Sequence, residues 1–303
     1  RLVFCPNQWL HVFPLHACRM IDGRVLAEQH EVVYTPSLSL LHRCANRHRP
    51  KARAGVLIQD PTSDLAFARV EGESLRRRFS GWGEPLVGSR AERERILRRA
   101  SRCDLLHYTG HSFFDPANAL ASGLVLGSKD DARLWLTLRH VFSELNLQRN
   151  RLTILNGCES GMLVPEIIDE YIGLTHGFLY AGAQCVLSTL WAVHDLSSAL
   201  LIDRFYQEWS AAAKSPATAL REAQRWLRED IRTGLQLRDE VLPNFLKPLK
   251  EARLKQSCLR LADAYAQNSP DSPPFASAVH WAPFMCTGLG YPLRVRAAGT
   301  APR

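Results

Sequence analysis

The sequence predicts an α/β protein with a mostly parallel central sheet and helices on both faces. Short apolar runs alternate along the chain with amphipathic segments of helical period, the order that builds a parallel sheet. Two apolar runs, 103–106 and 152–155, are each followed by a segment rich in reactive side chains, 107–111 and 156–161. Ligands bind outside the carboxyl ends of parallel strands, so the histidine and the cysteine of these segments can meet, although 47 positions separate them.

The first hundred residues are expected to begin this alternation. Residues 1–60 form a β-rich N-terminal part in this interpretation, because short extended runs at 9–14 and 31–34 flank the turn signal Asp22-Gly23. A basic loop is expected over 42–54. The elements that follow are a strand at 55–60 ending in Asp60-Pro61, an amphipathic helix at 64–79 and a helix at 91–102.

The rest of the chain continues the alternation, with one exception. The predicted elements are a strand at 123–126, a helix from Thr137 to Leu147, a helix from Pro165 to Tyr180, a strand at 185–191, helices at 196–210 and 216–232, and a last strand at 281–288. Residues 233–279 interrupt this order and are predicted as a helical insertion with a polar loop at 268–274. One domain is therefore expected over residues 1–291, followed by a C-terminal tail at 292–303.

The composition is typical of a globular protein, with 46% hydrophobic and 22% charged residues among 303. No apolar run reaches 18 residues, so no membrane span is expected. The net charge of +8 is concentrated in arginine-rich stretches at 43–53, 76–78 and 93–102. We interpret these stretches as solvated faces. The alternative is a surface for an acidic partner or a nucleic acid, although they lack the interleaved aromatic residues of a single-strand binder.

Cysteine usage indicates a reducing compartment. The eight cysteines are scattered and form no Cys-x-x-Cys pair, so no disulfide framework is expected and a cytoplasmic location is favoured. No secretory signal opens the chain. Because the sequence begins at Arg1 and continues at once with apolar residues, we expect it to be a fragment of a longer protein that continues upstream.

Cys158 and His111 are the predicted catalytic pair. A cysteine thiolate is a strong nucleophile, and a histidine can protonate the leaving amine and then activate water. The small residues beside Cys158, among them Gly157, let a substrate backbone approach closely. The oxyanion that forms during acyl transfer needs backbone N–H donors, and the amides of Cys158 and Ser112 are the candidates.

Other polar residues in these segments are weaker candidates for a functional role than Cys158 and His111. Asp115 and Glu159 are candidates for contacting a basic substrate side chain, although loop carboxylates are usually only solvated. His107 and His111 form a His-x-x-x-His pair, but His107 ends a strand and no acidic residue lies between the two. We therefore expect no metal and no cofactor, and predict that His107 is a packed histidine with one satisfied ring nitrogen.

Six blocks in the same order resemble the CHAT domain, a caspase-like domain associated with tetratricopeptide repeats. The blocks are 10–17, 34–37, 107–124, 156–161, 182–195 and 281–284, and the resemblance covers about residues 8–291. It implies a caspase-like fold, related to caspases, separases and gingipains, and cysteine endopeptidase activity through a Cys158/His111 dyad. It also implies that the segment from Trp191 to Asp195 lies beside the substrate cleft, which makes both of these residues candidates for substrate binding.

The chain departs from the family's usual pattern at three places. Ser112 stands where glycine usually follows the catalytic histidine, Gly157 stands where alanine is common, and the 233–279 segment is longer than expected. We interpret this segment as a docking or regulatory element.

The resemblance also implies a protein context and leaves alternatives open. It implies upstream tetratricopeptide repeats and a latent protease that a partner, such as an RNA-guided complex, activates in bacterial defence. One alternative is a catalytically inactive CHAT scaffold that mediates protein–protein interaction. A nucleic-acid-binding module, suggested by the net charge of +8, is the other alternative.

Overall fold

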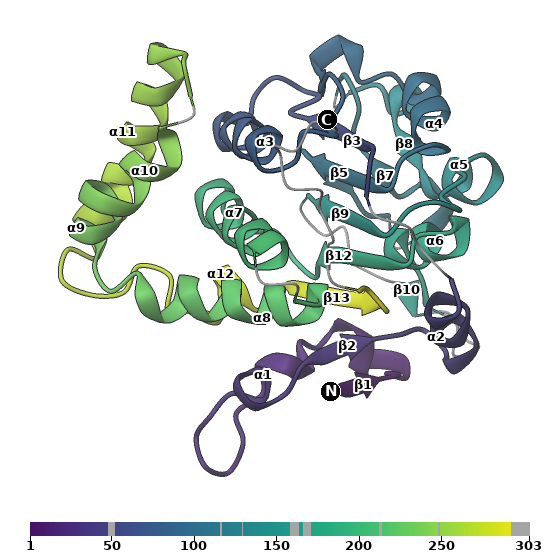
Figure 1. Ribbon diagram of the computed structural model, residues 1–303, viewed down its shortest axis with the longest axis horizontal. Helices are drawn as coiled ribbons and strands as arrows, with labels where there is room; N and C mark the ends of the chain where they lie inside the picture. The colour runs from purple at the N-terminus through teal and green to yellow at the C-terminus, as the bar shows by residue number, and fades with distance from the viewer. Residues whose placement is uncertain are drawn as a thin grey trace, which may run out of the picture.

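The central feature of the computed structural model is an eight-stranded sheet, ordered β1-β2-β13-β12-β9-β5-β3-β4 (Figure 1). Its strands are β1 (Leu2–Phe4), β2 (Val32–Tyr34), β3 (Gly55–Gln59), β4 (Leu86–Val87), β5 (Leu105–Thr109), β9 (Leu152–Asn156), β12 (Cys185–Thr189) and β13 (Phe284–Gly288). All neighbouring strands are parallel except β12 and β13, which confirms the predicted mostly parallel sheet. The structure describes residues 1–47, 52–115, 117–128, 130–157, 164–165, 171–211, 214–247 and 249–291.

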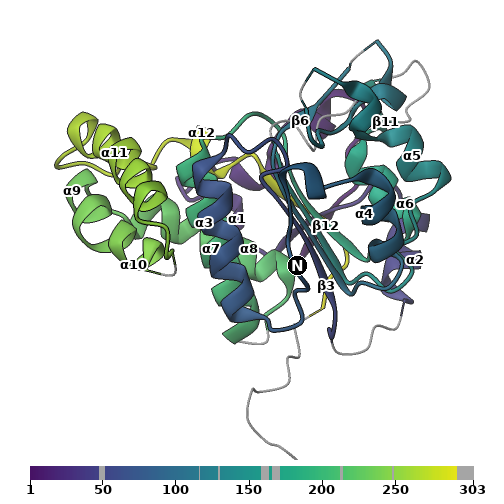
Figure 2. The ribbon, with the colours of Figure 1, turned by 90° about the horizontal axis from the view of Figure 1, so that it is seen from above.

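Helices cover both faces of the sheet, as predicted (Figure 2). One face carries α3 (Ala66–Arg78), α7 (Asp195–Ala211) and α8 (Pro216–Arg225); the other carries α2 (Leu38–Ala45), α4 (Arg93–Ala100), α5 (Leu138–Ser143) and α6 (Leu174–Ala181). In β3, Leu57 joins the core under α3 and α7, whereas its neighbours Val56 and Ile58 join the core on the opposite face. Burial on both faces explains why the strands are continuous apolar runs rather than alternating ones.

The N-terminal part corrects one prediction. Residues 9–14 are not a strand: Gln8–Val12 and Leu15–Ala17 are 3₁₀ helices, followed by α1 (Leu26–Gln29). The strand β1 already pairs with β2, so this segment cannot add a strand there. The hydroxyl of Tyr34 forms hydrogen bonds with both the amide and the Nδ1 of His16, and these bonds hold the segment over the end of the sheet. Residues 42–45, predicted as loop, extend α2, which begins after the Ser37 cap.

A second correction concerns the segment before α6. The predicted helix from Pro165 to Tyr180 is wrong at Pro165 and at 171–172, because Val164–Pro165 (β10) and Tyr171–Ile172 (β11) pair as antiparallel strands. The helix α6 begins only at Leu174, after Gly173. Proline tolerates the edge of such a hairpin as well as a first helical turn, so the sequence signal at Pro165 was ambiguous. Residues 166–170 lie outside the described residues.

A small antiparallel sheet lies beside the main one. It has the order β6-β7-β8, with β6 (Ser112–Phe113), β7 (Gly123–Leu124) and β8 (Leu136–Thr137). The strand predicted at 123–126 is therefore real over two residues but belongs to this sheet. Short 3₁₀ helices, Gly88–Arg90, Ala119–Ala121 and Ala132–Leu134, occur in the connections.

Residues 226–268 form a helical arm that stands away from the sheet in Figure 1. Its elements are two π-helical segments, Trp226–Asp230 and Leu237–Val241, and the helices α9 (Gly234–Gln236), α10 (Leu242–Leu246) and α11 (Ala252–Asn268); α12 (Ala278–Trp281) then leads into β13. The arm packs on α3 from outside, where Arg69 pairs with Glu251 at 3.1 Å. Within the described ranges, no helix is both long and apolar enough to cross a membrane.

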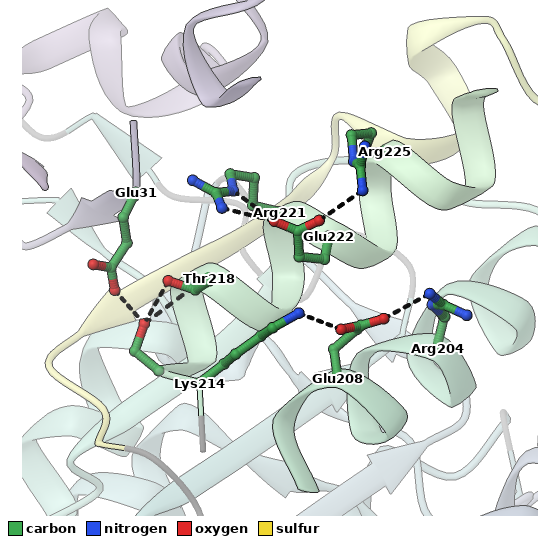
Figure 3. A network of polar contacts seen from close by, with 9 residues as sticks. Glu31, Arg204, Glu208, Lys214, Thr218, Arg221, Glu222 and Arg225 are labelled. Atoms are coloured by element: carbon green, nitrogen blue, oxygen red, sulfur yellow. Dashed lines mark hydrogen bonds and ion pairs between the residues drawn. The ribbon is translucent and has the colours of Figure 1, made fainter. Parts of the chain in front are cut away.

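Surface ion pairs fix the corner between α7 and α8 (Figure 3). Glu208 accepts from Arg204 and Lys214, and Glu222 accepts from Arg221 and Arg225. Ser215 caps α8 by accepting from the Thr218 amide and donates to Glu31, next to β2. These side chains are mostly half-buried, and ion pairs at a protein surface are worth about 0–1 kcal/mol each, so we assign the network to orienting α8 against β2 rather than to stabilising the fold substantially.

We predict that Gly182→Ala destabilises the protein more than Gly23→Ala. Both glycines have positive φ, +125° and +81°, and an alanine in left-handed backbone costs about 1–2 kcal/mol. A Cβ at Gly182 would also lie 2.7 Å from the backbone of Leu147, whereas a Cβ at Gly23 meets nothing within 4 Å. The steric clash should add about 1–3 kcal/mol to the loss in unfolding free energy, measured by urea denaturation. Equal losses for the two variants would contradict this packing.

Candidate functional site

The carboxyl ends of β5 and β9 lie side by side. The two strands pair in register, so Thr109 faces Asn156, and the Gly110 amide continues the pairing by donating to the Asn156 carbonyl at 3.1 Å. The segment that carries His111 and the segment that carries Cys158 therefore leave the sheet at the same edge, as the strand pattern predicted.

Gly157 brings these two segments into contact. A Cβ built on Gly157 would lie 2.8 Å from the Gly110 carbonyl oxygen and 3.2 Å from the Ser112 Oγ, so a larger residue would require the histidine loop to shift. The Gly157 carbonyl accepts from Thr189 at 2.6 Å, which ties it to β12 on the other side. Cys158 follows Gly157 directly in the chain, but Cys158 and Glu159 lie outside the described residues.

His111 has a carboxylate partner that the sequence analysis missed. Its Nε2 lies 3.0 and 3.3 Å from the two carboxylate oxygens of Asp64, and its side chain is 26% exposed. A carboxylate in this position orients the ring and stabilises the imidazolium, and it leaves Nδ1 for proton exchange with a nucleophile or a leaving group. The signal in the sequence was a carboxylate soon after the strand that neighbours β5, but residue 64 was interpreted only as the start of the helix predicted at 64–79.

The loop that carries Asp64 is held in an unusual conformation. Asp60 and Ser63 have φ values of 44° and 62°, the two positive values among non-glycine residues that the structure describes. The buried Asp60 carboxylate accepts from the amides of Asp64 and Leu65 at 3.0 and 3.1 Å. Backbone strain of this kind persists where surrounding bonds over-determine it and is frequent at functional sites. Asp60 thus positions the partner of His111.

The segment from Trp191 to Asp195 follows β12, the strand next to β9, and so leaves the sheet at the same edge. Asp195 is the first residue of α7, and its carboxylate accepts from the Phe67 amide in the first turn of α3 at 3.1 Å. Burial, together with the nearby carboxyls of Glu71, Asp60 and Asp64, raises the pKa of Asp195 to about 7. Trp191 donates to the Val279 carbonyl at 3.2 Å. A substrate contact by either side chain stays a prediction.

Two further candidates have structural partners. The Asp115 carboxylate accepts from the amides of Ala117 and Asn118 at 2.9 and 3.1 Å, closing its own loop, and its role in substrate binding stays a prediction. Both ring nitrogens of the buried His107 have partners, Glu71 at 2.6 Å and Tyr206 at 3.2 Å, where one was expected. In the part of the chain that the structure describes, no three histidine, cysteine or acidic residues are arranged to hold a metal ion.

Comparisons with known proteins identify the family of the chain. The family model described as "CHAT domain" matches residues 1–289. The chain is 30% identical over 175 residues to human tetratricopeptide repeat protein 28, covering 47% of this chain and 7% of that protein; the mouse protein is 27% identical over 168 residues, covering 45% and 7%. The chain thus spans only a small part of these relatives.

Among solved structures, the Saccharomyces cerevisiae separase–securin complex is similar, with a TM-score of 0.51 and 16% identity. The match covers 71% of this chain and 13% of that one. Identity this low shows likeness of fold alone, and the fold is that of the caspase-like cysteine peptidases.

We predict a pH-dependent stability difference between the wild type and Asp195→Asn. A carboxyl whose pKa is about 7 in the folded state and about 4 when unfolded stabilises the fold at low pH, and that contribution is lost as the pH rises from about 4 to about 7. Asparagine keeps an oxygen for the Phe67 amide but does not titrate. Urea denaturation at several pH values should therefore show the variant gaining stability relative to wild type towards pH 7. An identical pH dependence of the two proteins would contradict the burial of this carboxyl; Asp271→Asn, on an exposed loop, is the control.

Proposed function

This chain belongs to the CHAT domain family, and on that premise we propose that it is a cysteine endopeptidase that uses Cys158 as nucleophile and His111 as general acid and base. The observation that carries the proposal is the contact of Gly157 with the His111 loop, together with the pairing of His111 and Asp64. A scaffold that only binds partners has no need for a carboxylate that orients a partly exposed histidine at the end of a strand.

The proposed reaction has two steps. The Cys158 thiolate attacks the carbonyl carbon of the scissile peptide bond, a C–S bond forms, and the C–N bond breaks as His111 gives a proton to the leaving amine. Water then attacks the thioester while His111 takes a proton from it, and the C–S bond breaks to release the carboxylic acid and restore the Cys158 thiolate beside protonated His111. General acid–base assistance of this kind contributes ~10²–10⁴-fold.

Backbone donors of the histidine and cysteine loops are proposed to bind the oxyanion. The Ser112 amide is one of them, and the close packing of Gly157 against Ser112 favours a fixed geometry, which such a donor needs. A serine in place of the family's usual glycine keeps the amide, so it does not by itself argue against activity.

We also propose the context that the sequence suggested. Association with tetratricopeptide repeats is supported by the name of the human and mouse relatives. The upstream position of the repeats, an activating partner and the bacterial defence setting stay predictions. None of the seven cysteines that the structure describes forms a disulfide, and a reducing, cytoplasmic location stays a prediction. Direct binding of nucleic acid stays a prediction.

The first test is selective labelling of Cys158 by a panel of peptide-ketone electrophiles, measured by intact mass and peptide mapping. A working dyad predicts rapid labelling of Cys158 that falls sharply in His111→Ala and is unchanged in His42→Ala, which alters a histidine on α2. The exposed thiols Cys5 and Cys18 serve as internal controls, because their labelling should not respond to either variant. If Cys158 is labelled at the same rate in wild type and in His111→Ala, with or without a partner protein, the result would favour the inactive scaffold instead.

We further predict that Asp64→Asn slows labelling of Cys158 about 10- to 100-fold, since the amide cannot stabilise the imidazolium although it can still contact the ring. The control is Asp239→Asn, which removes an exposed carboxylate from the helical arm, where it pairs with Arg238. The measurement is the second-order rate constant for labelling. If both variants react at the wild-type rate, Asp64 has no part in the reaction.

A further inference from the structure

Beneath the candidate site lies a buried carboxyl that the proposed reaction does not use. Glu71, in the middle of α3, is 0% exposed, although an amphipathic helix of this length would normally direct a glutamate to solvent. The groups on α7 that act on it electrostatically, Asp203 and Asp195, are themselves carboxyls and not cations. A buried acid in such a place is costly unless its hydrogen bonds are needed.

The two oxygens of Glu71 divide between the two strands that end at the site. Oε1 lies 2.6 Å from the His107 Nε2 of β5, while Oε2 accepts from the Asn156 amide group of β9 at 2.8 Å and from the Thr109 hydroxyl of β5 at 3.5 Å. Thr109 and Asn156 face each other in the sheet and are the last residues of their strands. One side chain therefore clamps both carboxyl ends.

The clamp continues into α7. The His107 Nδ1 lies 3.2 Å from the Tyr206 hydroxyl, and Asn156 also donates to Ser198 at 3.4 Å. Tyr206 and Ser198 are on α7, the helix that begins at Asp195. The buried network thus joins α3, β5, β9 and α7 directly below the residues assigned to catalysis and to the substrate cleft.

We propose that Glu71 is a positioning residue, whose bonds to His107 and Asn156 fix the separation between the His111 loop and Gly157. This proposal rests on the proposed function. A misplacement of about 1 Å in a reacting group can lower the rate ~10²-fold, so a residue that fixes the position of the strand ends can maintain the reaction rate.

The bonds of Glu71 are those of a neutral pair. Burial raises the pKa of Glu71 well above its usual range and lowers that of His107 to about 3, so both groups favour their uncharged forms. The pair is therefore a hydrogen bond rather than a salt bridge. Glutamine is neutral and has the same shape, with one donor for His107 and one acceptor for Asn156, so it can replace the carboxylic acid.

The test compares Glu71→Gln with Glu71→Leu, and Glu73→Gln is the matched control on the same helix, where Glu73 is exposed and pairs with Arg76. Electrophile labelling of Cys158 gives a limiting rate and a half-saturating concentration for each variant. We expect the leucine variant to lose ~10- to 100-fold in limiting rate with little change in half-saturation. The glutamine and control variants should stay within about threefold of wild type. A folded leucine variant with the wild-type limiting rate, or a glutamine variant as slow as leucine, would overturn the proposal.

A second readout does not depend on activity. Hydrogen–deuterium exchange should accelerate in segments 107–113 and 152–157 of Glu71→Leu, and not in Glu71→Gln, because only leucine breaks the clamp. If wild type shows no Cys158 reactivity, the proposed function fails, and this exchange pattern still decides whether Glu71 holds the strand ends. Should Glu71→Leu not fold, Asn156→Ala removes one arm of the clamp. It should show the same local exchange and rate loss, and unchanged values would overturn the proposal.

Discussion

The structure depends on the in-register pairing of β5 with β9. These two strands occupy the middle of the sheet, are buried on both faces, and end together at Thr109 and Asn156. Everything assigned to the site follows from this arrangement: the His111 loop leaves one strand, the Gly157 turn leaves the next, and the Gly110 amide keeps bonding to Asn156 beyond the strand. In a pair of parallel strands, the segments that follow both strands leave at the same end of the sheet. Residues distant in the sequence can therefore come together there without long loops.

The residues of the site are held in place by hydrogen bonds to buried carboxyl groups in the protein interior, rather than by contacts at the solvent-exposed surface. Asp60 holds the loop of Asp64 through two backbone amides, Asp195 caps the start of α3, and Glu71 joins both strand ends. These three buried or half-buried carboxyls come from the residue that follows β3, from α7 and from α3, and these elements pack on one another. The site is therefore organised by contacts between elements and not by its own loops, an arrangement that favours fixed geometry. The helical arm rests on the outside of α3 and so lies one layer from the clamp.

The elements that a local sequence pattern determines were predicted correctly. The side-chain contacts between residues distant in the sequence were not predicted. The apolar runs of β3, β5, β9 and β12 identified the parallel sheet, and the reactive residues at their ends identified the candidate site. Asp64 was missed because it was assigned to the start of the helix predicted at 64–79, and only the neighbouring position of β3 and β5 brings it to His111. Glu71 was missed because a glutamate in an amphipathic helix predicts exposure. The prediction of a strand at 9–14 was wrong for a different reason: a short apolar run does not distinguish a strand from a 3₁₀ helix.

The central claim is that residue 111 and Cys158 meet at the edge of the sheet, and a short thiol-bridging reagent tests it most directly. In a His111→Cys variant whose exposed Cys5 and Cys18 are replaced by serine, the account predicts an efficient intramolecular cross-link between positions 111 and 158, identified by peptide mapping. A matched His42→Cys variant, with the new thiol on α2, should not cross-link to Cys158. Two thiols that each take up reagent singly, with no bridged peptide, would contradict the account, because they would place the histidine and the cysteine at separate sites.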